Sequence, residues 1–336
     1  MIMKITYIFR AQSNQRSIER VFGPVIEEMI ASGNELEVEY AEKGRTLIST
    51  LWKNMRLFSV LSKHRLCHIT GDVQYVACMM NPDNTLLTIH DLVPFHNKNV
   101  PWYSRWLCYW LWYYIPLRRL KIVTCISEAT RQDLISYFPW AKDKIIVIPN
   151  PVDTHFRFVS KEFNATCPRI LHIGTKPNKN LLRVIEALDG IKCQLRIIGR
   201  IPEAERLALQ EYSIDYSNEE FVSDEQILQE YVDCDIVSFP SLFEGFGMPI
   251  IEGQATGRVV VTSNIDPMRT VAGEGAVFVN PNEVNSIREG FIKAKELKGI
   301  RMIAIEKGLV NAKKYSVQSI TASYVNSYNI LLHDDI

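Results

Sequence analysis

Two glutamates eight positions apart, Glu244 and Glu252, enclose a glycine-containing run that includes Pro249. The apolar residues 236–240 before the run predict a buried strand, the glycines predict a tight loop, and Pro249 predicts the first turn of a helix. Free N–H groups and the helix dipole would favour a phosphate-bearing ligand there. Glu252 could accept hydrogen bonds from a ribose diol, and Glu244 could reach a sugar beyond the phosphates. The alternative is a solvated Glu252 beside glycines that only make a turn.

Two further polar residues stand after predicted strands. His90 follows the apolar run 86–89, so we expect it at the carboxyl end of a strand, where ligands bind in parallel α/β folds. The alternative is a His–Asp pair with Asp91 that caps a helix or is satisfied in the core. Lys179 lies in a basic loop after residues 169–173 and could neutralise a diphosphate leaving group. The alternative there is a solvated loop lysine.

The segment from Ser241 to Glu252 resembles the acidic signature of the retaining nucleotide-sugar glycosyltransferases of family 4, which have the GT-B fold. In that signature two glutamates enclose seven residues, with Gly-Phe-Gly and a proline between them. The match is to glycosyl transferases group 1 of the bacterial polysaccharide type. Further matches follow in order along most of the chain, namely His90-Asp91-x-x-Pro94, residues 125–134, Ile148-Pro149-Asn150-Pro151-Val152-Asp153 and residues 170–181.

The resemblance implies a role for each candidate residue. Glu244, His90 and Lys179 would be catalytic: Glu244 would hold hydroxyls of the donor sugar, His90 would contact that sugar from the opposite domain, and Lys179 would stabilise the diphosphate. Glu252 would hold the ribose. The donor nucleotide would be bound by Gly174, Thr175, Lys179, Gly245, Phe246, Gly247, Met248 and Glu252.

The loop that carries Lys179 departs from the family pattern. The family usually has Gly-Arg a few residues before Lys-Asn, whereas Thr175 follows Gly174 here and the loop is one residue shorter. Lys176 could substitute for the missing arginine. Because no Asp-x-Asp metal site stands in a fitting place, we expect a metal-independent reaction without cofactor, with a nucleotide-diphosphate-sugar as co-substrate.

Short apolar strands alternate with helical patterns along all 336 residues, which predicts parallel α/β architecture. Strands are expected at 3–9, 36–40, 66–70, 86–89, 122–125 and 145–148 in the first half, and at 169–173, 194–198, 219–222, 235–239, 259–262 and 276–279 in the second. One long helical pattern at 285–330 follows them. Two strand sets of comparable size, separated by Pro149 and Pro151, predict two doubly wound Rossmann-like domains facing a central cleft, as in GT-B. We expect an acceptor-binding domain at 1–150 and a donor-binding domain at 151–318. By resemblance, a C-terminal helix at 319–336 crosses back onto the first domain.

Composition sets further bounds. With 47% hydrophobic and 23% charged residues the chain is expected to be globular. Residues 1–150 hold 18 Lys+Arg against 13 Asp+Glu, a net charge of +5, and the remainder holds 20 against 25, a net charge of −5. The seven cysteines show no CxxC pair, which favours a reducing compartment. No apolar run is long enough for a transmembrane helix, so a cytoplasmic protein is expected.

Two stretches of the basic half indicate a membrane surface. Residues 43–66 contain six cationic side chains and no acid, and residues 102–121 combine eight Trp and Tyr rings with Arg and Lys. Such mixtures favour the interface of an anionic bilayer, and peripheral binding at the inner face of the cell membrane is expected. The alternative places the aromatic rings in the core. Single-stranded nucleic acid is disfavoured as a partner.

These patterns together predict a transferase. We expect a glycosyltransferase that moves a sugar from a nucleotide-diphosphate-sugar to a saccharide acceptor, carried on a lipid, with retention of configuration, in cell-surface polysaccharide or lipopolysaccharide biosynthesis. One alternative is a GT-B nucleotide-sugar epimerase, whose acid–base carboxylates are not evident. The other is a non-catalytic membrane-associated scaffold that binds no nucleotide.

Overall fold

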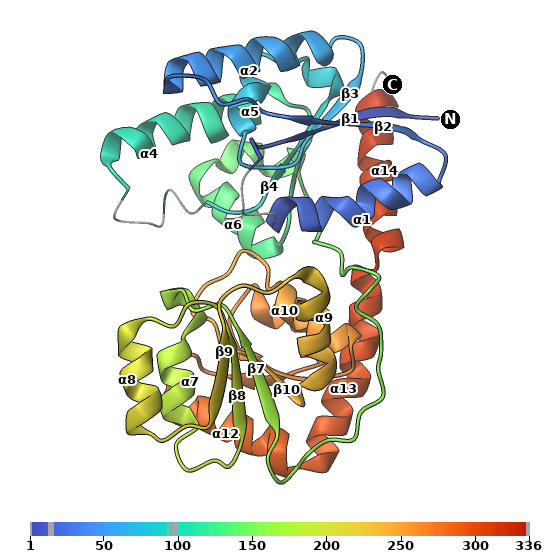
Figure 1. Ribbon diagram of the computed structural model, residues 1–336. Coiled ribbons are helices and arrows are strands. Elements are labelled where there is room, and N and C mark those ends of the chain that lie inside the picture. The colour runs from blue at the N-terminus through green and yellow to red at the C-terminus, as the bar shows by residue number, and fades with distance from the viewer. Residues whose placement is uncertain (1, 13–16, 93–94, 96–99, 334–336) are drawn as a thin grey trace. The chain divides into compact units, whose positions relative to one another are not determined.

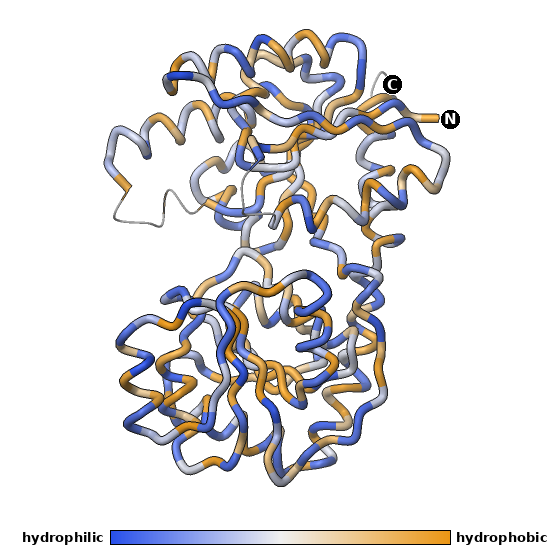
Figure 2. Tube along the Cα trace, in the orientation of Figure 1, coloured by the Kyte–Doolittle hydropathy of each residue, from blue (hydrophilic) through white to orange (hydrophobic). Residues whose placement is uncertain are grey.

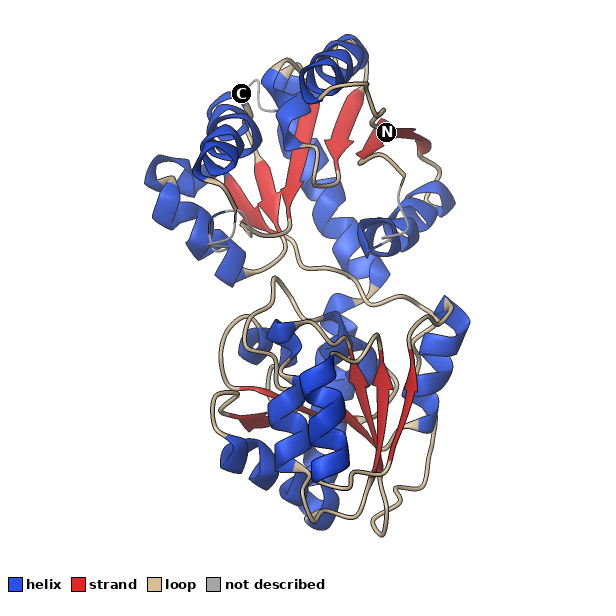
Figure 3. Cartoon of the chain, turned by 60° about the vertical axis from the view of Figure 1, so that its left-hand side comes forward, coloured by secondary structure: helices blue, strands red, loops and turns tan. Residues whose placement is uncertain are grey.

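The computed structural model describes residues 2–12, 17–92, 95 and 100–333 (Figure 1). The chain forms two compact units, one made of Met1–Pro151 with Val317–Ile336 and the other of Val152–Ser316. Each unit contains a six-stranded parallel sheet with helices on both faces (Figure 3). The predicted class, two doubly wound α/β domains, is confirmed.

The sheet of the first unit has the strand order β2-β1-β3-β4-β5-β6. Its strands β3, β4 and β5 are buried along their whole length, as expected where helices cover both faces of a parallel sheet. All six lie within one or two residues of the predicted ranges. The strands are β1 Lys4–Phe9, β2 Glu35–Tyr40, β3 Leu66–Ile69, β4 Thr85–Ile89, β5 Val123–Cys125 and β6 Ile145–Val147.

Two helices of the first unit begin at recognisable caps. Thr46 and Ser49 form a capping box at the start of α2, and Ser127 accepts a hydrogen bond from the N–H of Thr130 at the start of α6. Hydrophobic and hydrophilic bands alternate along α2 (Figure 2). The helices are α1 Ser17–Ala31, α2 Leu47–Leu61, η1 Gln74–Cys78, η2 Pro82–Asn84, α4 Trp102–Cys108, the π-helical η3 Tyr109–Tyr114, α5 Ile115–Arg119, α6 Glu128–Tyr137, η4 Pro139–Lys144 and α14 Val317–His333.

Helix α14, although last in the described chain, belongs to the first unit and packs against α1. Its Tyr328 is fully buried, with its hydroxyl 2.7 Å from Nδ1 of His68 and 3.0 Å from the hydroxyl of Tyr7. Burial lowers the pKa of His68 to about 3, so the ring is neutral at physiological pH. Its other nitrogen is 2.8 Å from Oγ1 of Thr88 on β4. A buried polar network therefore fixes α14 to the central strands.

The second unit has the strand order β12-β11-β10-β7-β8-β9. Gly253 in α10 lets that helix approach the sheet, since a Cβ there would lie 2.9 Å from a methyl carbon of Val237. The strands are β7 Arg169–Ile173, β8 Gln194–Ile198, β9 Tyr216–Glu219, β10 Ile236–Phe239, β11 Val259–Ser263 and β12 Val277–Val279. The helices are η5 Pro177–Lys179, α7 Leu181–Ala187, α8 Glu203–Glu211, α9 Asp224–Asp233, α10 Met248–Ala255, α11 Met268–Ala272, α12 Val284–Glu296, α13 Lys298–Ala312 and η6 Lys313–Tyr315.

One predicted strand is misplaced. Sequence pattern favoured residues 219–222, but β9 spans Tyr216–Glu219, and Phe221 beyond it is 87% exposed. β9 is the edge strand of its sheet, so it needs little apolar character, and the apolar pair after it is misleading. The single long helical pattern at 285–330 is in fact divided among α12, α13 and α14. No described helix is long and apolar enough to cross a membrane.

Candidate functional site

The glycine loop joins β10 to α10, as the sequence predicted. Gly247 ends the loop with φ +115°, and a Cβ there would lie 3.0 Å from Cδ1 of Ile250, so glycine is required at this position. Phe246 is buried, with its ring packed edge-on against Tyr315 at 5.7 Å. Its side chain therefore anchors the loop, and only its backbone is available to a ligand. Met248 is the first residue of α10.

Lys179 and Glu244, 65 positions apart in sequence, form an ion pair in the second unit. Nζ of Lys179 donates to Oε1 of Glu244 at 2.6 Å, and both side chains are mostly buried. The same ammonium lies 4.6 Å from the centre of the Phe239 ring at the end of β10. The structure thus unites one cation and one carboxylate beside the glycine loop. A phosphate and a sugar hydroxyl are the groups that this pair can bind.

Asn178 organises the pair and was missed by sequence reasoning. Its side-chain amide donates to the backbone carbonyl of Phe243 at 3.0 Å and to Oε1 of Glu244 at 3.2 Å. The backbone carbonyl of Asn178 accepts a hydrogen bond from the backbone N–H of Leu242 at 2.8 Å. Asparagine in a proline-containing loop is an ordinary turn residue, so the sequence gives no sign that its partner lies at position 244.

Replacing Asn178 by aspartate is expected to lower kcat/KM about tenfold or more, because a carboxylate beside Glu244 repels it from its position. The melting temperature should change little, since Asn178 lies in a loop and is only partly buried. The matched control is Asn280→Asp, because the Asn280 amide also donates to a glutamate, Glu283, at 2.7 Å. Equal kcat/KM values for the two variants would show that Asn178 has no positioning role.

Gly174 and Thr175 follow β7. Gly174 has φ +90°, and a Cβ there would lie 3.1 Å from two carbons of the Lys179 side chain, so the glycine makes room for that lysine. The Thr175 hydroxyl donates to the carbonyl of Arg200 at 2.6 Å. Thr175, at the place of the usual arginine, therefore ties its loop to the end of β8, and Lys176 beside it is exposed.

Glu252 lies in α10, where Tyr231 of α9 holds it. The Tyr231 hydroxyl donates to Oε2 of Glu252 at 2.5 Å. Burial, together with the Glu252 carboxylate, raises the pKa of Tyr231 well above its usual value, so the hydroxyl stays protonated and remains a donor. Glu252 is therefore an oriented carboxylate rather than a freely solvated one. Tyr231 is a second residue that the sequence pattern did not indicate.

His90 lies at the carboxyl end of β4 in the first unit, whereas the Lys179–Glu244 pair belongs to the second unit. Its Nε2 is 2.7 Å from the carbonyl oxygen of Thr70. Because a carbonyl only accepts, Nε2 carries the proton, and Nδ1 is the acceptor of the neutral ring. Burial lowers the pKa of His90, which favours that neutral form. Gly71 is pressed against the ring, since a Cβ there would lie 2.6 Å from its Cδ2.

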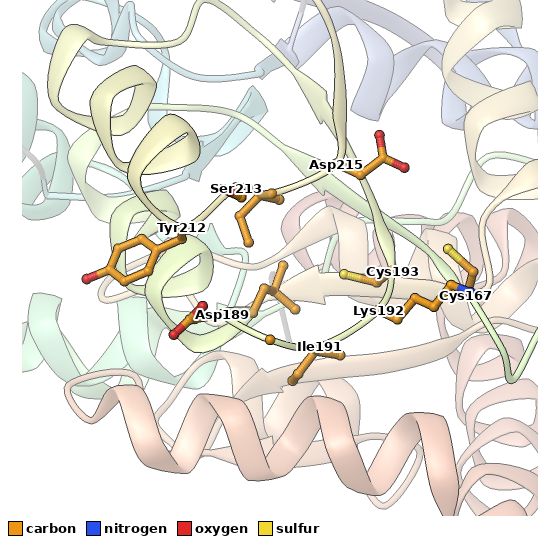
Figure 4. A pocket seen from close by; sticks show the side chains of 11 residues that line it. Cys167, Asp189, Ile191, Lys192, Cys193, Tyr212, Ser213 and Asp215 are labelled. Atoms are coloured by element: carbon orange, nitrogen blue, oxygen red, sulfur yellow. The ribbon is translucent and has the colours of Figure 1, made fainter.

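A hollow of about 530 Å³ lies elsewhere in the second unit (Figure 4). Its lining includes Cys193, which precedes β8, and Asp215, which precedes β9, so it opens at the amino ends of the strands. The predicted residues of this unit follow the carboxyl ends instead, and none of them lines the hollow. Within the described ranges, no group of three or more His, Cys, Asp or Glu could hold a metal ion.

Comparison with known proteins finds related sequences for residues 44–309. Residues 156–309 match the family model of glycosyl transferases group 1, and residues 44–156 match that of glycosyltransferase family 4. O-antigen chain mannosyltransferase B of Escherichia coli is 26% identical over 236 residues, which cover 63% of this chain and 61% of that protein. O-antigen chain mannosyltransferase RfbU of Salmonella typhimurium is 26% identical over 227 residues, which cover 64% and 62%. The matched region is thus about three fifths of each relative's length.

Solved structures show the same fold. A glycosyltransferase from Rickettsia africae superimposes with a TM-score of 0.79 at 17% identity, covering 99% of this chain and 100% of that one. WaaG, a glycosyltransferase involved in lipopolysaccharide biosynthesis, gives a TM-score of 0.72 at 11% identity, covering 98% and 100%. The two family models together extend over residues 44–309. The chain therefore contains a glycosyltransferase family 4 domain at 44–156 ahead of a glycosyl transferases group 1 domain at 156–309, and it has the GT-B fold.

Proposed function

We propose that this protein transfers a sugar from a nucleotide-diphosphate-sugar to a saccharide acceptor with retention of anomeric configuration. The observation that carries the proposal is the Lys179–Glu244 ion pair beside the glycine loop. Glu252, which follows in the next helix, is oriented by the hydroxyl of Tyr231. Lys179 would neutralise the diphosphate as its bond to the anomeric carbon breaks. Glu244 would accept hydrogen bonds from hydroxyls of the donor sugar, and Glu252 from the ribose.

The remaining diphosphate charge would be met by backbone N–H groups of residues 245–247 and by the amino end of α10. The acceptor hydroxyl would form the new bond to the anomeric carbon and pass its proton to the departing diphosphate. No metal or cofactor is required by this scheme, because the cation is a side chain. His90 would contact the donor sugar through Nδ1, which its neutral ring offers as an acceptor.

The second unit supplies Lys179, Glu244 and Glu252, so residues 151–318 would bind the donor and residues 1–150 the acceptor. The mannosyltransferases named for O-antigen chains support an acceptor in cell-surface polysaccharide synthesis. Such an acceptor would be carried on a lipid, and the protein would bind it at the inner face of the cell membrane. The acid-free basic stretch at 43–66 supports this setting.

A thermal-shift and calorimetric screen tests the donor site. UDP, GDP, ADP, CMP and TDP are each added without metal and then with magnesium. One nucleoside diphosphate is expected to bind without metal, and at a hundred times its dissociation constant it should stabilise the fold by about 2.7 kcal/mol. Binding by none of them would contradict the proposal and favour a scaffold. Consumption of donor without acceptor, and with inverted sugar stereochemistry, would favour an epimerase.

A further inference from the structure

Helix α13 of the second unit carries its large apolar side chains on the outside. The residues that it buries are small or polar, namely Arg301, Ala304, Gly308, Asn311 and Ala312. Met302, Ile303 and Val310 are instead 58%, 54% and 59% exposed, and Leu297 and Ile300 near its start are exposed as well. A surface helix of a globular protein normally shows the reverse distribution, with its apolar residues toward the core.

Packing inside the unit accounts for the buried face of α13. The helix packs on α10, where a Cβ on Gly308 would lie 3.0 Å from Cγ of Gln254 and 3.3 Å from the carbonyl oxygen of Gly275, so only a small residue fits. The Asn311 amide donates to the carbonyl of Val271 at 2.8 Å. The exposed apolar side chains take no part in these contacts. Apolar side chains gathered on one exposed face mark an interaction surface.

The exposed residues of α13 have the spacing of a seam between paired helices. Ile303, Glu306 and Val310 follow at intervals of three and four residues, which places them in one line along the helix. Lys307, beside Glu306, contacts the exposed Glu274 at 2.5 Å, and its ammonium can donate to a second carboxylate as well. We call Met302, Ile303, Glu306, Lys307 and Val310 the α13 face.

The charges on and around the α13 face are of both signs. The exposed charged residues of the helix and of the segments that border it are Glu274, Glu296, Lys298, Glu306, Lys307, Lys313 and Lys314. A partner surface of a single sign does not suit this face, because either Glu306 or Lys307 would then meet a like charge. A second copy of the same face offers both signs.

We propose that the α13 face pairs with the α13 face of a second copy of the chain, with the two helices antiparallel. A two-fold axis between positions 306 and 307 places Ile303 of one copy opposite Val310 of the other, and Glu306 opposite Lys307. Each contact occurs twice, once on either side of the axis. Parallel pairing would instead place Glu306 against Glu306, which like-charge repulsion disfavours. The inference goes beyond the proposed function and does not depend on it.

Sedimentation equilibrium of the full chain tests the pairing. The apolar part of the face is small, so we expect a reversible dimer with a dissociation constant on the order of 10 μM, measured between about 1 and about 200 μM. Ile303→Asp should weaken the dimer about tenfold or more, because it places a carboxylate in the apolar seam. Circular dichroism should show an unchanged fold, since Ile303 is exposed in the single chain. The control Leu207→Asp, at a position 56% exposed in α8, should dimerise as the parent does.

Charge reversal tests the antiparallel register. Glu306→Lys and Lys307→Glu each place like charges opposite one another, so each variant alone should dimerise about tenfold more weakly than the parent. A mixture of the two variants should form a heterodimer as tight as the parent dimer, because two positive side chains of one variant then face two negative side chains of the other. The control Glu203→Lys reverses an exposed charge on α8 and should leave the dimer unchanged.

Three outcomes would overturn the inference. The first is a parent that stays monomeric over the whole concentration range. If that monomer sediments with lipid vesicles and Ile303→Asp does not, the face belongs to a bilayer. The second is a dimer that Ile303→Asp leaves intact, which would place the contact elsewhere. The third is a mixture of the two charge variants that stays monomeric, which would exclude the antiparallel pairing. None of these measurements requires a nucleotide or an acceptor, so failure of the proposed function would leave them valid.

Discussion

Replacing Lys179 by alanine is expected to lower kcat/KM for transfer by about a hundredfold to a thousandfold. The ammonium is the cation that pairs with Glu244, so its loss leaves that carboxylate with an uncompensated charge in a mostly buried place. A diphosphate would then meet a negative charge where it had met a positive one. Both nucleotide binding and turnover should fall, which calorimetry and steady-state kinetics measure separately.

Two companion variants make this result specific. Lys192→Ala removes an exposed lysine of the same unit at the opposite end of its sheet, and it should leave kcat/KM unchanged. Glu252→Ala should weaken nucleotide binding, because the carboxylate held by Tyr231 is lost. If Lys179→Ala and Glu252→Ala both bind and turn over like the parent, the donor site has been assigned to the wrong residues.

Replacing Tyr328 by alanine should lower the free energy of unfolding of the first unit by about 3–5 kcal/mol. The substitution empties a fully buried ring position in α14 and removes the hydroxyl that meets His68 and Tyr7. Tyr328→Phe keeps the ring and should cost about 1–3 kcal/mol, because those two buried polar groups lose a partner. Urea denaturation followed by a signal specific to the first unit measures both values.

The control for this network is Tyr216→Phe, which removes the hydroxyl of a partly exposed tyrosine on the edge strand β9. Its effect on stability should be within about 0.5 kcal/mol. A loss of stability as small as this in Tyr328→Phe would mean that the His68 network does not stabilise the attachment of α14.

The sequence was sufficient for the architecture because buried parallel strands read as apolar runs between helical patterns. The sequence was insufficient at β9, because an edge strand needs no apolar run. It was also insufficient in the aromatic segment 102–121, because an aromatic residue type alone does not separate the exposed Trp106 from the buried Tyr113. At the candidate site, Glu244, Glu252 and Lys179 stand out by motif.

The residues that orient these motif side chains cannot be recognised in the sequence. Asn178 contacts Glu244 across 66 positions of sequence, and Tyr231 contacts Glu252 across 21. In the sequence, Asn178 looks like any asparagine of a turn, and Tyr231 looks like any tyrosine of a core. Contacts of this kind depend on which loops the strand order of the sheet brings together. The hydrophobic pattern of a single strand does not predict which strands will be its neighbours.

The place of α14 has a consequence for how the chain is made. Its Ile320 and Tyr324 share a core with Phe22 and Met29 of α1, near the other end of the chain. During synthesis that core stays open while all of Val152–Ser316 leaves the ribosome. The second unit is continuous in sequence and can close first, so folding is completed in the reverse of the order of translation. Until α14 emerges, the nascent first unit presents an unpaired apolar face that a chaperone can recognise.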